Sequence, residues 1–346
     1  MKVFLDASAL ASGHANRGIG TYTRELLNAV RLLLNSELEI VTDPHLIESA
    51  DCIHRPYFDL FSRTFQYAKT PTIVTIHDVI PLQLPQLYPI GIRGRVAFEF
   101  QKRAVRSASL IVTDSQASKQ AIYFHLGIPL DKIRVVYLAA SSHFSPQSTQ
   151  RQNEVSQKYA LPEKYILYVG DINANKNIPA LIEAVSQIDP MYHLVLLGRA
   201  FTPQDIPEWH LIDTSVKKHH LENRVHYLSN IATEAQDELS AIYQLAECYV
   251  QPSFLEGFGL PILEALSLGT PVVSTTGGSL PEVGGEVVRY VEGFTSEHIA
   301  NAIRATLESS PVLKANTSAR GKVWAADFTW EKVAKQMLQI YREVLS

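Results

Sequence analysis

Cysteine is scarce in this chain, because Cys52 and Cys248 are the only two among 346 residues. Each lies in an apolar, strand-like stretch far from the other, so we expect two buried free thiols rather than a disulfide or a metal site. The sequence also lacks the run of about 18 to 20 apolar residues that a membrane-spanning helix needs. The N-terminal run MKVFLDASAL reaches Asp6 at once and lacks the apolar core of a signal peptide. We therefore expect a cytoplasmic protein, and leave open a peripheral contact with the inner face of a membrane.

Runs of like charge are missing as well. The formal net charge is -4, and no stretch of five or six like charges occurs, which argues against nucleic acid as a partner. The absence of an evident basic amphipathic helix argues against strong membrane binding. Hydrophobic residues make up 46% of the chain, enough to fill the cores of about two domains at ~150 residues each. The composition is that of a globular protein.

Short apolar runs alternate with amphipathic segments along the whole chain, which predicts an α/β fold with parallel sheets. We expect helices near 92–107 and 116–126, and near Asn177, Thr233 and Pro261, with two helical stretches at the end of the chain. The strands of the first half are KVFLDAS, LEIVTD, CIHRPY, PTIVTIHD, SLIVTDS and IRVVYLA. Those of the second half are YILYVG, HLVLLG, RVHYLS, ECYVQPS, PVVSTT and EVVRYVE.

A polar stretch rich in Ser and Gln, SSHFSPQSTQRQNEVSQKYALP, separates the two halves. It predicts one doubly wound domain over 1–155 and a second over 156–327. Ligands of such open sheets bind beyond the carboxyl ends of the strands, so the loops that follow strands are where chemistry is expected.

The run SFLEGFGLPILEALSLGT follows one of these strands. Pro261 suits a first helical turn and Gly269 a C-terminal cap, which predicts a helix over about 261–268. The N–H groups of Phe258, Gly259 and Leu260 would then point out of a helix N-terminus, where a diphosphate can bind. A plain structural turn also explains the glycines.

Two glutamates in this run require a second explanation. A carboxylate in an anion site is repulsive unless it faces hydroxyl groups, so Glu256 and Glu264 suit a sugar and a ribose. The alternative is that Glu256 is a loop charge and Glu264 a solvated helix residue. The spacing alone leaves both interpretations open.

The retaining GT-B glycosyltransferases of family 4 have an E-x7-E signature, and one run of this chain resembles it: Glu256-Gly-Phe-Gly-Leu-Pro-Ile-Leu-Glu264, followed by Ala265, Gly269, Pro271 and Val272. The resemblance extends over nearly the whole chain. It implies two Rossmann-like domains facing a central cleft, an N-terminal acceptor-binding domain and a C-terminal domain for the nucleotide sugar. It also implies that a last helix, within 328–346, crosses back to the first domain.

The resemblance assigns further residues. In GHANRGIGTYTRELL, Gly18 and Gly20 resemble a glycine loop near the donor phosphates, although a tight turn also explains them; a third dinucleotide-motif glycine and a Walker lysine are missing. His77 in TIHDVIP resembles a histidine beside the transferred sugar, although a lone histidine at a strand end is often structural. Asn230 and Ile231 resemble a segment that lines the nucleotide base.

Lys176 in YVGDINANKN resembles the family's lysine that neutralises the leaving diphosphate. Many members also have an arginine in this loop, whereas Asp171 and Asn175 occupy the neighbouring positions here. The source of a second positive charge is therefore open, with Arg17 and Arg199 as candidates. A solvated loop charge is the alternative explanation for Lys176.

By resemblance, the reaction is a retaining, metal-independent transfer of a hexose from a nucleotide diphosphate sugar, with UDP as the expected nucleotide. The acceptor is expected to be a glycan or lipid-linked saccharide in exopolysaccharide biosynthesis. Glu256, His77 and Lys176 are the expected catalytic residues, in the sense of positioning and electrostatic support. The expected donor-binding residues are Gly18, Gly20, Lys176, Asn230, Ile231, Glu256, Gly257, Phe258, Gly259, Leu260 and Glu264. No cofactor is expected, because Asp-x-Asp, HExxH and paired CxxC motifs are missing.

Two alternatives stay open at this point. A nucleotide-sugar epimerase of GT-B fold would show the same two-domain pattern. A non-catalytic nucleotide-sugar-binding protein would also keep these loops, and the missing arginine is compatible with it.

Overall fold

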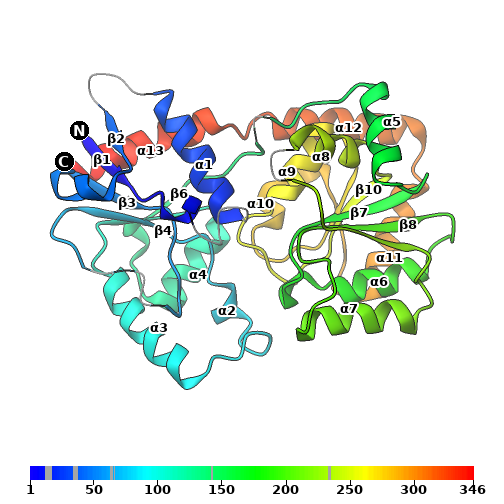
Figure 1. The fold of residues 1–346 in the computed structure, drawn as a ribbon, viewed down its shortest axis with the longest axis horizontal. Helices are drawn as coiled ribbons and strands as arrows, with labels where there is room; N and C mark the ends of the chain where they lie inside the picture. Colours follow the sequence, from blue (N-terminus) through cyan, green and yellow to red (C-terminus); the bar gives the residue numbers. More distant parts are fainter. Residues whose placement is uncertain (12–17, 34–37, 63–64, 66, 142, 233–234) are drawn as a thin grey trace. The chain divides into compact units, whose positions relative to one another are not determined.

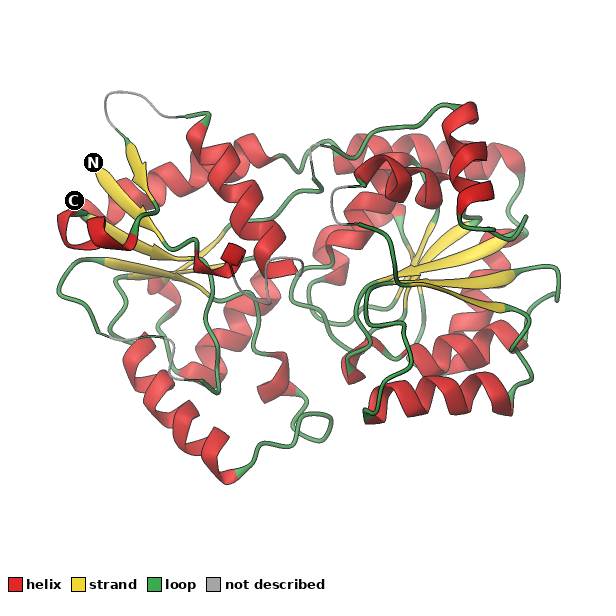
Figure 2. Cartoon of the chain, viewed as in Figure 1, coloured by secondary structure: helices red, strands yellow, loops and turns green. Residues whose placement is uncertain are grey.

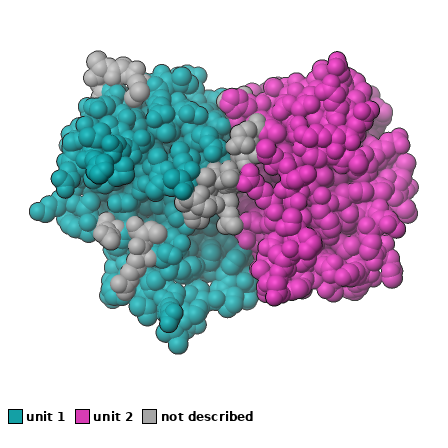
Figure 3. Space-filling view, in the orientation of Figure 1, with its two compact units in different colours: residues 1–139, 328–346 teal, residues 140–327 magenta. Residues whose placement is uncertain are grey.

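The computed structural model describes residues 1–11, 18–33, 38–62, 65, 67–141, 143–232 and 235–346. The chain forms two compact units (Figure 3). The first contains Met1–Ala139 together with Phe328–Ser346, and the second contains Ala140–Asp327. In each unit a sheet lies between layers of helices (Figure 2).

The first unit has a six-stranded parallel sheet in the order β2-β1-β3-β4-β5-β6. Its central strands are continuous apolar runs, as expected for parallel strands covered on both faces. The strands are β1 (Lys2–Leu5), β2 (Glu39–Val41), β3 (Cys52–Arg55), β4 (Thr72–Thr75), β5 (Leu110–Thr113) and β6 (Ile133–Val135).

Helices of the first unit cover both faces of its sheet, with α1 packed against α13 on one of them (Figure 1). The α-helices are α1 (Gly18–Arg31), α2 (Ile80–Gln83), α3 (Ile92–Val105), α4 (Gln116–Leu126) and α13 (Trp330–Leu345). Short 3-10 helices are η1 (Ser8–Ala11), η2 (Pro44–Ser49) and η3 (Leu130–Lys132).

The second unit has a parallel sheet in the order β12-β11-β10-β7-β8-β9. The chain order of its strands reverses between β7 and β10, and ligands of doubly wound sheets bind at such a switch point. The strands are β7 (Tyr165–Val169), β8 (His193–Leu197), β9 (Val225–Leu228), β10 (Cys248–Gln251), β11 (Val272–Ser274) and β12 (Arg289–Tyr290). The predicted strands of both halves are thereby confirmed.

The sheet of the second unit is covered by α6, α7 and α11 on one face and by α5, α8, α9 and α12 on the other (Figure 1). The α-helices are α5 (Thr149–Lys158), α6 (Ile178–Ser186), α7 (Pro207–Lys218), α8 (Gln236–Leu245), α9 (Leu260–Leu268), α10 (Leu280–Gly284), α11 (Ser296–Leu307) and α12 (Pro311–Ala325). The 3-10 helices are η4 (Ala174–Lys176) and η5 (Gly285–Val287).

The helix predictions need two corrections. The helix expected near Thr233 begins at Gln236 in the structure, and Thr233 itself lies outside the described residues. The chain ends in three helices, α11, α12 and α13, rather than two, because Ser309 and Ser310 interrupt the first stretch. Cys52 and Cys248 are buried free thiols, as expected.

The boundary between the units differs from the prediction. It lies after Ala139, whereas the sequence suggested residue 155. The polar stretch that was predicted to separate the two domains contains α5. This helix packs on α8 through a charged cluster. Arg151 and Lys158 of α5 form ion pairs with Glu238 of α8, at 3.1 and 2.7 Å. Polar composition therefore concealed a helix that is held by charged contacts as well as by the buried side chain of Val155.

The last helix, α13, belongs to the first unit and is held there by a buried polar chain. Tyr341 on α13 lies 2.8 Å from Nδ1 of His54, and the other ring nitrogen of His54 lies 2.9 Å from the hydroxyl of Thr75. That hydroxyl is 3.3 Å from the hydroxyl of Tyr22 on α1. Burial, and then the charge of His77, lowers the pKa of His54 to about 3, so this ring is neutral. This series of hydrogen-bonded side chains connects α13, two strands and α1.

Tyr341→Phe should loosen this attachment. The substitution leaves one buried nitrogen of His54 without its partner, which costs about 1–3 kcal/mol of stability. Urea denaturation should show the loss, and amide hydrogen exchange should place it in α13. Tyr123→Phe is the matched control, because the Tyr123 side chain on α4 is 49% exposed. Equal stability of the two variants would contradict a stabilising role for the Tyr341 hydroxyl.

Candidate active site

Two loops meet at the switch point of the second unit. The loop after β7 contains η4, which ends at Lys176, and the loop after β10 contains Glu256. The ammonium of Lys176 lies 2.8 and 2.9 Å from the two carboxylate oxygens of Glu256. The side chains are 18% and 9% exposed, so this ion pair is largely shielded from water. The structure thus brings together two residues that are 80 positions apart in the chain.

Neutral donors complete the environment of Glu256. Its Oε1 accepts hydrogen bonds from the hydroxyl of Ser253 at 2.6 Å and from the amide of Gln251 at 2.8 Å. The same Gln251 amide lies 2.7 Å from Ser253, and the Gln251 carbonyl accepts from the buried Tyr249 hydroxyl. The carboxylate is therefore fixed in orientation by groups of β10 and the turn that follows it.

Asn175, which stands near the position where an arginine was expected, has a structural role. It is buried, and its side-chain amide donates to the carbonyl of Leu255 at 2.8 Å. The backbone carbonyl of Asn175 accepts a hydrogen bond from the backbone N–H of Phe254 at 2.8 Å. Asn175 thus fastens the Lys176 loop to the Glu256 loop. The backbone N–H of Ile172 donates to the Asp171 carboxylate at 2.8 Å.

A third loop supports Glu256 from the other side. The backbone of Gly278 forms an isolated parallel bridge with Glu256, at a φ of +68°. A Cβ on Gly277 would lie 2.3 Å from the carbonyl oxygen of Phe254, so a larger residue does not fit there. The Ser279 hydroxyl donates to the carbonyls of Glu256 and Phe258, at 3.1 and 2.8 Å. The small residues of this segment therefore allow two loops to pack closely.

The run from Gly257 to Leu260, which the sequence predicts to bind the donor, forms the turn that opens α9. Helix α9 begins at Leu260, one residue before the predicted start, and ends at Leu268 as expected. Gly259 precedes it with a φ of +104°, in the left-handed region that favours glycine. Phe258 is buried, so the run offers backbone rather than a large side chain at this helix end.

Glu264 lies one turn into α9 and is partly buried. Its Oε2 accepts a hydrogen bond of 2.8 Å from the hydroxyl of Tyr243 on α8. Burial raises the pKa of Glu264 to about 7, although the hydrogen bond from Tyr243 acts in the opposite direction. This carboxyl group therefore changes its charge near neutral pH.

Asn230 and Ile231 follow β9, which is separated from β7 by β8. They share the carboxyl edge of the sheet with Lys176, but β8 stands between the two loops. Ile231 is buried, whereas Asn230 is exposed. Arg199, a candidate for a second positive charge, follows β8 and is exposed.

In the first unit, His77 follows β4 and forms a close pair with a residue that the sequence analysis overlooked. Its Nδ1 lies 2.6 Å from the carboxylate of Asp114, which directly follows β5. Its Nε2 lies 3.2 Å from the carbonyl oxygen of Pro56. Both neighbours only accept hydrogen bonds, so the doubly protonated ring satisfies both. The run SLIVTDS, which carries Asp114, forms the strand beside that of PTIVTIHD, which carries His77. This pairing was the signal that could have identified Asp114.

Gly18 and Gly20 lie at the start of α1. A Cβ on Gly18 would meet no atom of the described residues within 4 Å. Gly20 is buried within the helix. Arg17, the other candidate for a second positive charge, lies outside the described residues.

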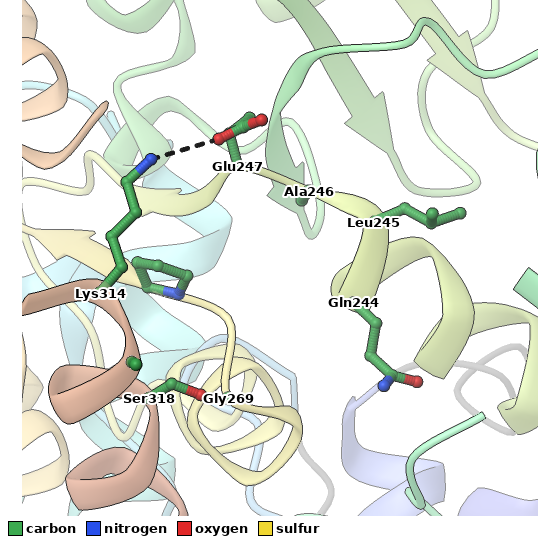
Figure 4. A pocket seen from close by; sticks show the side chains of 9 residues that line it. Gln244, Leu245, Ala246, Glu247, Gly269, Lys314 and Ser318 are labelled. Atoms are coloured by element: carbon green, nitrogen blue, oxygen red, sulfur yellow. Dashed lines mark ion pairs between the residues drawn. The ribbon is translucent and has the colours of Figure 1, made fainter. Parts of the chain in front are cut away.

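A surface hollow of about 360 Å³ lies at the opposite end of the second sheet (Figure 4). It is formed around the residues that precede β10 and β11, including Glu247 and Pro271. Lys314 of α12 pairs with Glu247 across 3.5 Å, which offsets the charges inside the hollow. This hollow therefore offers no charged site comparable to the Lys176 region. Among the described residues, no group of three or more His, Cys, Asp or Glu side chains could hold a metal ion.

Asp114→Asn should lower the pKa of His77. Burial lowers this pKa, but the charge and hydrogen bond of Asp114, together with Asp78 and the carbonyl of Pro56, raise the pKa above its ordinary value of 6.5. The protonated ring therefore stabilises the fold at low pH, and this contribution is lost as pH rises through the folded value. Proton NMR titration should show the drop in Asp114→Asn, with His77→Gln identifying the resonance.

Asp78→Asn is the comparison for this experiment, because Asp78 also raises the pKa of His77, by a smaller charge effect than Asp114. We expect a smaller shift in that variant. An unchanged His77 titration in Asp114→Asn would show that the pair does not govern the charge of the ring.

Comparison with known families accounts for most of the chain. The model of Glycosyl transferases group 1 matches residues 150–324, and that of Glycosyltransferase Family 4 matches residues 15–140. The O-antigen chain mannosyltransferase B of Escherichia coli is 34% identical over 276 residues, which are 78% of this chain and 70% of the relative. The serotype-specific mannosyltransferase WbdA of Escherichia coli is 28% identical over 284 residues, 79% of this chain but 34% of that relative.

Solved structures share the fold at lower identity. Sucrose-phosphate synthase of Thermosynechococcus elongatus matches with a TM-score of 0.76 and 20% identity, over 99% of both chains. The Anabaena protein HepE, solved in complex with UDP and glucose, matches with a TM-score of 0.75 and 20% identity, again over 99% of both chains. In the described part of the chain, no helix is both long and apolar enough to cross a membrane. The chain belongs to glycosyltransferase family 4, the group 1 glycosyl transferases, and is a glycosyltransferase with the GT-B fold.

Proposed function

We propose that this enzyme transfers a hexose, specifically mannose, from a nucleoside diphosphate sugar to a saccharide acceptor during the synthesis of a surface polysaccharide. The observation that carries the proposal is the shielded pair of Lys176 and Glu256 at the switch point between β7 and β10. A cation for the phosphates and a carboxylate for the sugar hydroxyls stand side by side there.

The chemistry assigned to Lys176 follows from its position. A departing diphosphate accumulates negative charge, and an ammonium fixed in a poorly hydrated site stabilises that charge far better than water does. The diphosphate competes with Glu256 for the ammonium, so donor binding draws Lys176 toward the phosphates. The backbone around Gly259, at the start of α9, supplies N–H groups for the same anion.

Glu256 then becomes available to the transferred sugar. Ser253 and Gln251 still hold its Oε1, so the carboxylate keeps its orientation when Lys176 moves. A fixed carboxylate accepts hydrogen bonds from two sugar hydroxyls and holds the ring for reaction. We assign Glu256 a positioning and electrostatic role, and name no nucleophile.

The relatives support mannose as the sugar, because both Escherichia coli proteins are named mannosyltransferases. The base is proposed from two sources. The resemblance to family 4 favours uridine or guanosine, and the HepE structure contains UDP. UDP stays our prediction, and GDP is the alternative that the test below distinguishes.

Three parts of the proposal rest on the family resemblance. These are retention of configuration, independence of a metal ion, and an acceptor that is a glycan or a lipid-linked saccharide. His77 of the first unit is proposed to support the reaction as a positively charged ring. Its hydrogen bonds to Asp114 and Pro56 favour that charge state.

Substitution of the ion pair tests the proposal. Lys176→Ala should lower the turnover of mannosyl transfer by about 10²–10³-fold, the effect of removing one donor to a developing oxyanion. Glu256→Gln keeps an acceptor for Ser253 and should also lower turnover. Release of nucleoside diphosphate should be measured with UDP-linked and GDP-linked hexoses, with and without a saccharide acceptor, in buffers containing EDTA or magnesium.

Lys217→Ala is the matched control, since Lys217 forms an exposed ion pair with Asp213 on α7, with 2.6 Å between the charged atoms. Circular dichroism verifies that each variant is folded, because removal of one partner of a buried pair is itself destabilising. Full turnover in Lys176→Ala would remove this residue from the mechanism. A changed sugar without any released diphosphate would indicate an epimerase.

Glu264→Gln should reveal the role of the second glutamate. If the ionised carboxylate accepts ribose hydroxyls, donor affinity of the wild type rises as pH increases through about 7, the raised pKa of Glu264. The variant should bind about tenfold more weakly above that pH, as expected for the loss of one hydrogen bond to a charged group. Its affinity should vary less with pH.

Stability supplies an independent check on the same residue. A carboxyl group with a raised folded pKa makes the wild type less stable as pH rises from 4.5 to about 7, and Glu264→Gln removes that slope. Melting temperatures across this range measure it. The control is Glu308→Gln, at an exposed position after α11. Altered stability with unaltered donor binding would place Glu264 outside the donor site.

A further inference from the structure

Helix α3 of the first unit carries a stripe of apolar side chains that faces outward. Ile92, Val96 and Phe100 are 83%, 49% and 49% exposed. They are spaced four residues apart, so they lie along one side of the helix. The side chains that fix α3 to the unit, Gln101 and Val105, are each 1% exposed and lie on the opposite side.

The attachment of α3 is specific rather than loose. The amide of Gln101 donates to the carbonyl of Asp59 at 3.1 Å, and its oxygen accepts from the N–H of Phe65 at 3.4 Å. Phe98 packs beside Phe61, with 6.2 Å between the ring centroids. The outward direction of the stripe is therefore set by the packing of the inner side.

Positive charge surrounds this stripe. The segment 92–106 has five basic residues against a single acidic one, Glu99, although the whole chain has a formal net charge of -4. No acidic side chain in the described ranges forms an ion pair with any of these five basic residues. They are Arg93, Arg95, Lys102, Arg103 and Arg106. Arg93 and Arg103 are exposed and adjoin the apolar stripe.

We infer that α3 docks on an anionic lipid bilayer, with the side chains of Ile92, Val96 and Phe100 in the headgroup region. Apolar side chains flanked by arginines are the combination that interfacial helices use, and the arginines pair with anionic headgroups. A second protein is a poorer match, because a stable interface buries about 800 Å² on each partner, more than three partly exposed side chains provide.

The sequence concealed this surface. Helix α3 has apolar residues on two opposite sides, Phe98 and Val105 facing inward and the stripe facing outward. A search for one apolar side and one charged side therefore finds no clear pattern. Only the burial of Gln101 and Val105 shows which side of α3 faces the unit and which side is exposed.

Vesicle flotation of the full chain tests this inference. Binding to vesicles of equal parts phosphatidylcholine and phosphatidylglycerol should exceed binding to phosphatidylcholine alone, and added salt should weaken it. Arg93→Gln with Arg103→Gln should weaken binding roughly 25-fold, at about fivefold for each charge near an anionic surface. Ile92→Gln with Val96→Gln should weaken it about tenfold, because less apolar area is buried.

Two control variants change the same residue types on other helices. Val312→Gln with Val323→Gln alters valines of α12 that are 79% and 72% exposed. Arg304→Gln with Arg320→Gln alters two exposed arginines of α11 and α12. Both should bind vesicles as the wild type does. All substituted positions are on the surface, and melting temperatures verify folding.

Three outcomes would overturn the inference: no vesicle binding, equal binding to both vesicle types, or equal effects of the control variants. If the wild type ignores vesicles but forms dimers that the α3 variants abolish, the stripe is an interface between copies of this chain. Flotation needs neither donor nor acceptor, so its result is independent of the proposed transferase reaction.

Discussion

The ion pair between Lys176 and Glu256 is the constraint around which the second unit is arranged. Removal of two charges from water is costly, and a shielded pair is often no more stabilising than apolar residues of the same volume. The surrounding residues reduce that cost, because Ser253 and Gln251 satisfy Glu256 and Asn175 fastens the two loops together. Such full support for a pair that contributes little to stability favours the proposed role of the pair in donor binding.

Close packing of the backbone makes this arrangement attainable. The loop after β11 lies directly against the loop after β10, where Gly277 and Gly278 leave no room for side chains and the hydroxyl of Ser279 spans two carbonyls. Lys176, Glu256 and the start of α9 are therefore held by three loops at one edge of the sheet. The preorganisation that electrostatic catalysis requires is provided by glycines and hydroxyls rather than by additional charged groups.

The sequence predicted the strands because buried parallel strands are continuous apolar runs, as YILYV and CYVQ illustrate. It also indicated Lys176 and Glu256 as separate candidates. Their direct contact was not predictable, because it depends on the strand order that places β7 beside β10. The segment of α5 was predicted to separate the two domains because its composition is polar, and Asp114 was overlooked because its role exists only through a neighbouring strand.

Both units place a cationic side chain next to a carboxylate, with different residues in each. In each sheet a cationic side chain follows one strand and a carboxylate follows the hydrogen-bonded neighbour, as His77 and Asp114 follow β4 and β5. Lys176 and Glu256 follow β7 and β10 in the same way. Neighbouring parallel strands end about 4.8 Å apart at the same edge. His77 and Asp114 therefore meet just beyond their strands, whereas Lys176 and Glu256 are brought together by the loops that follow β7 and β10.

The difference between the two pairs lies in what else restrains them. The acidic partner of His77 directly follows its strand, and Thr75, two residues before His77, belongs to the buried chain through His54 to Tyr341 of α13. The histidine pair is therefore tied to the strand that anchors the last helix. Glu256 instead stands in a turn held by side-chain hydrogen bonds, and in the proposed reaction the ammonium of Lys176 leaves Glu256 for a phosphate. The first pair thus suits a fixed charge, and the second suits one that changes partners during a reaction cycle.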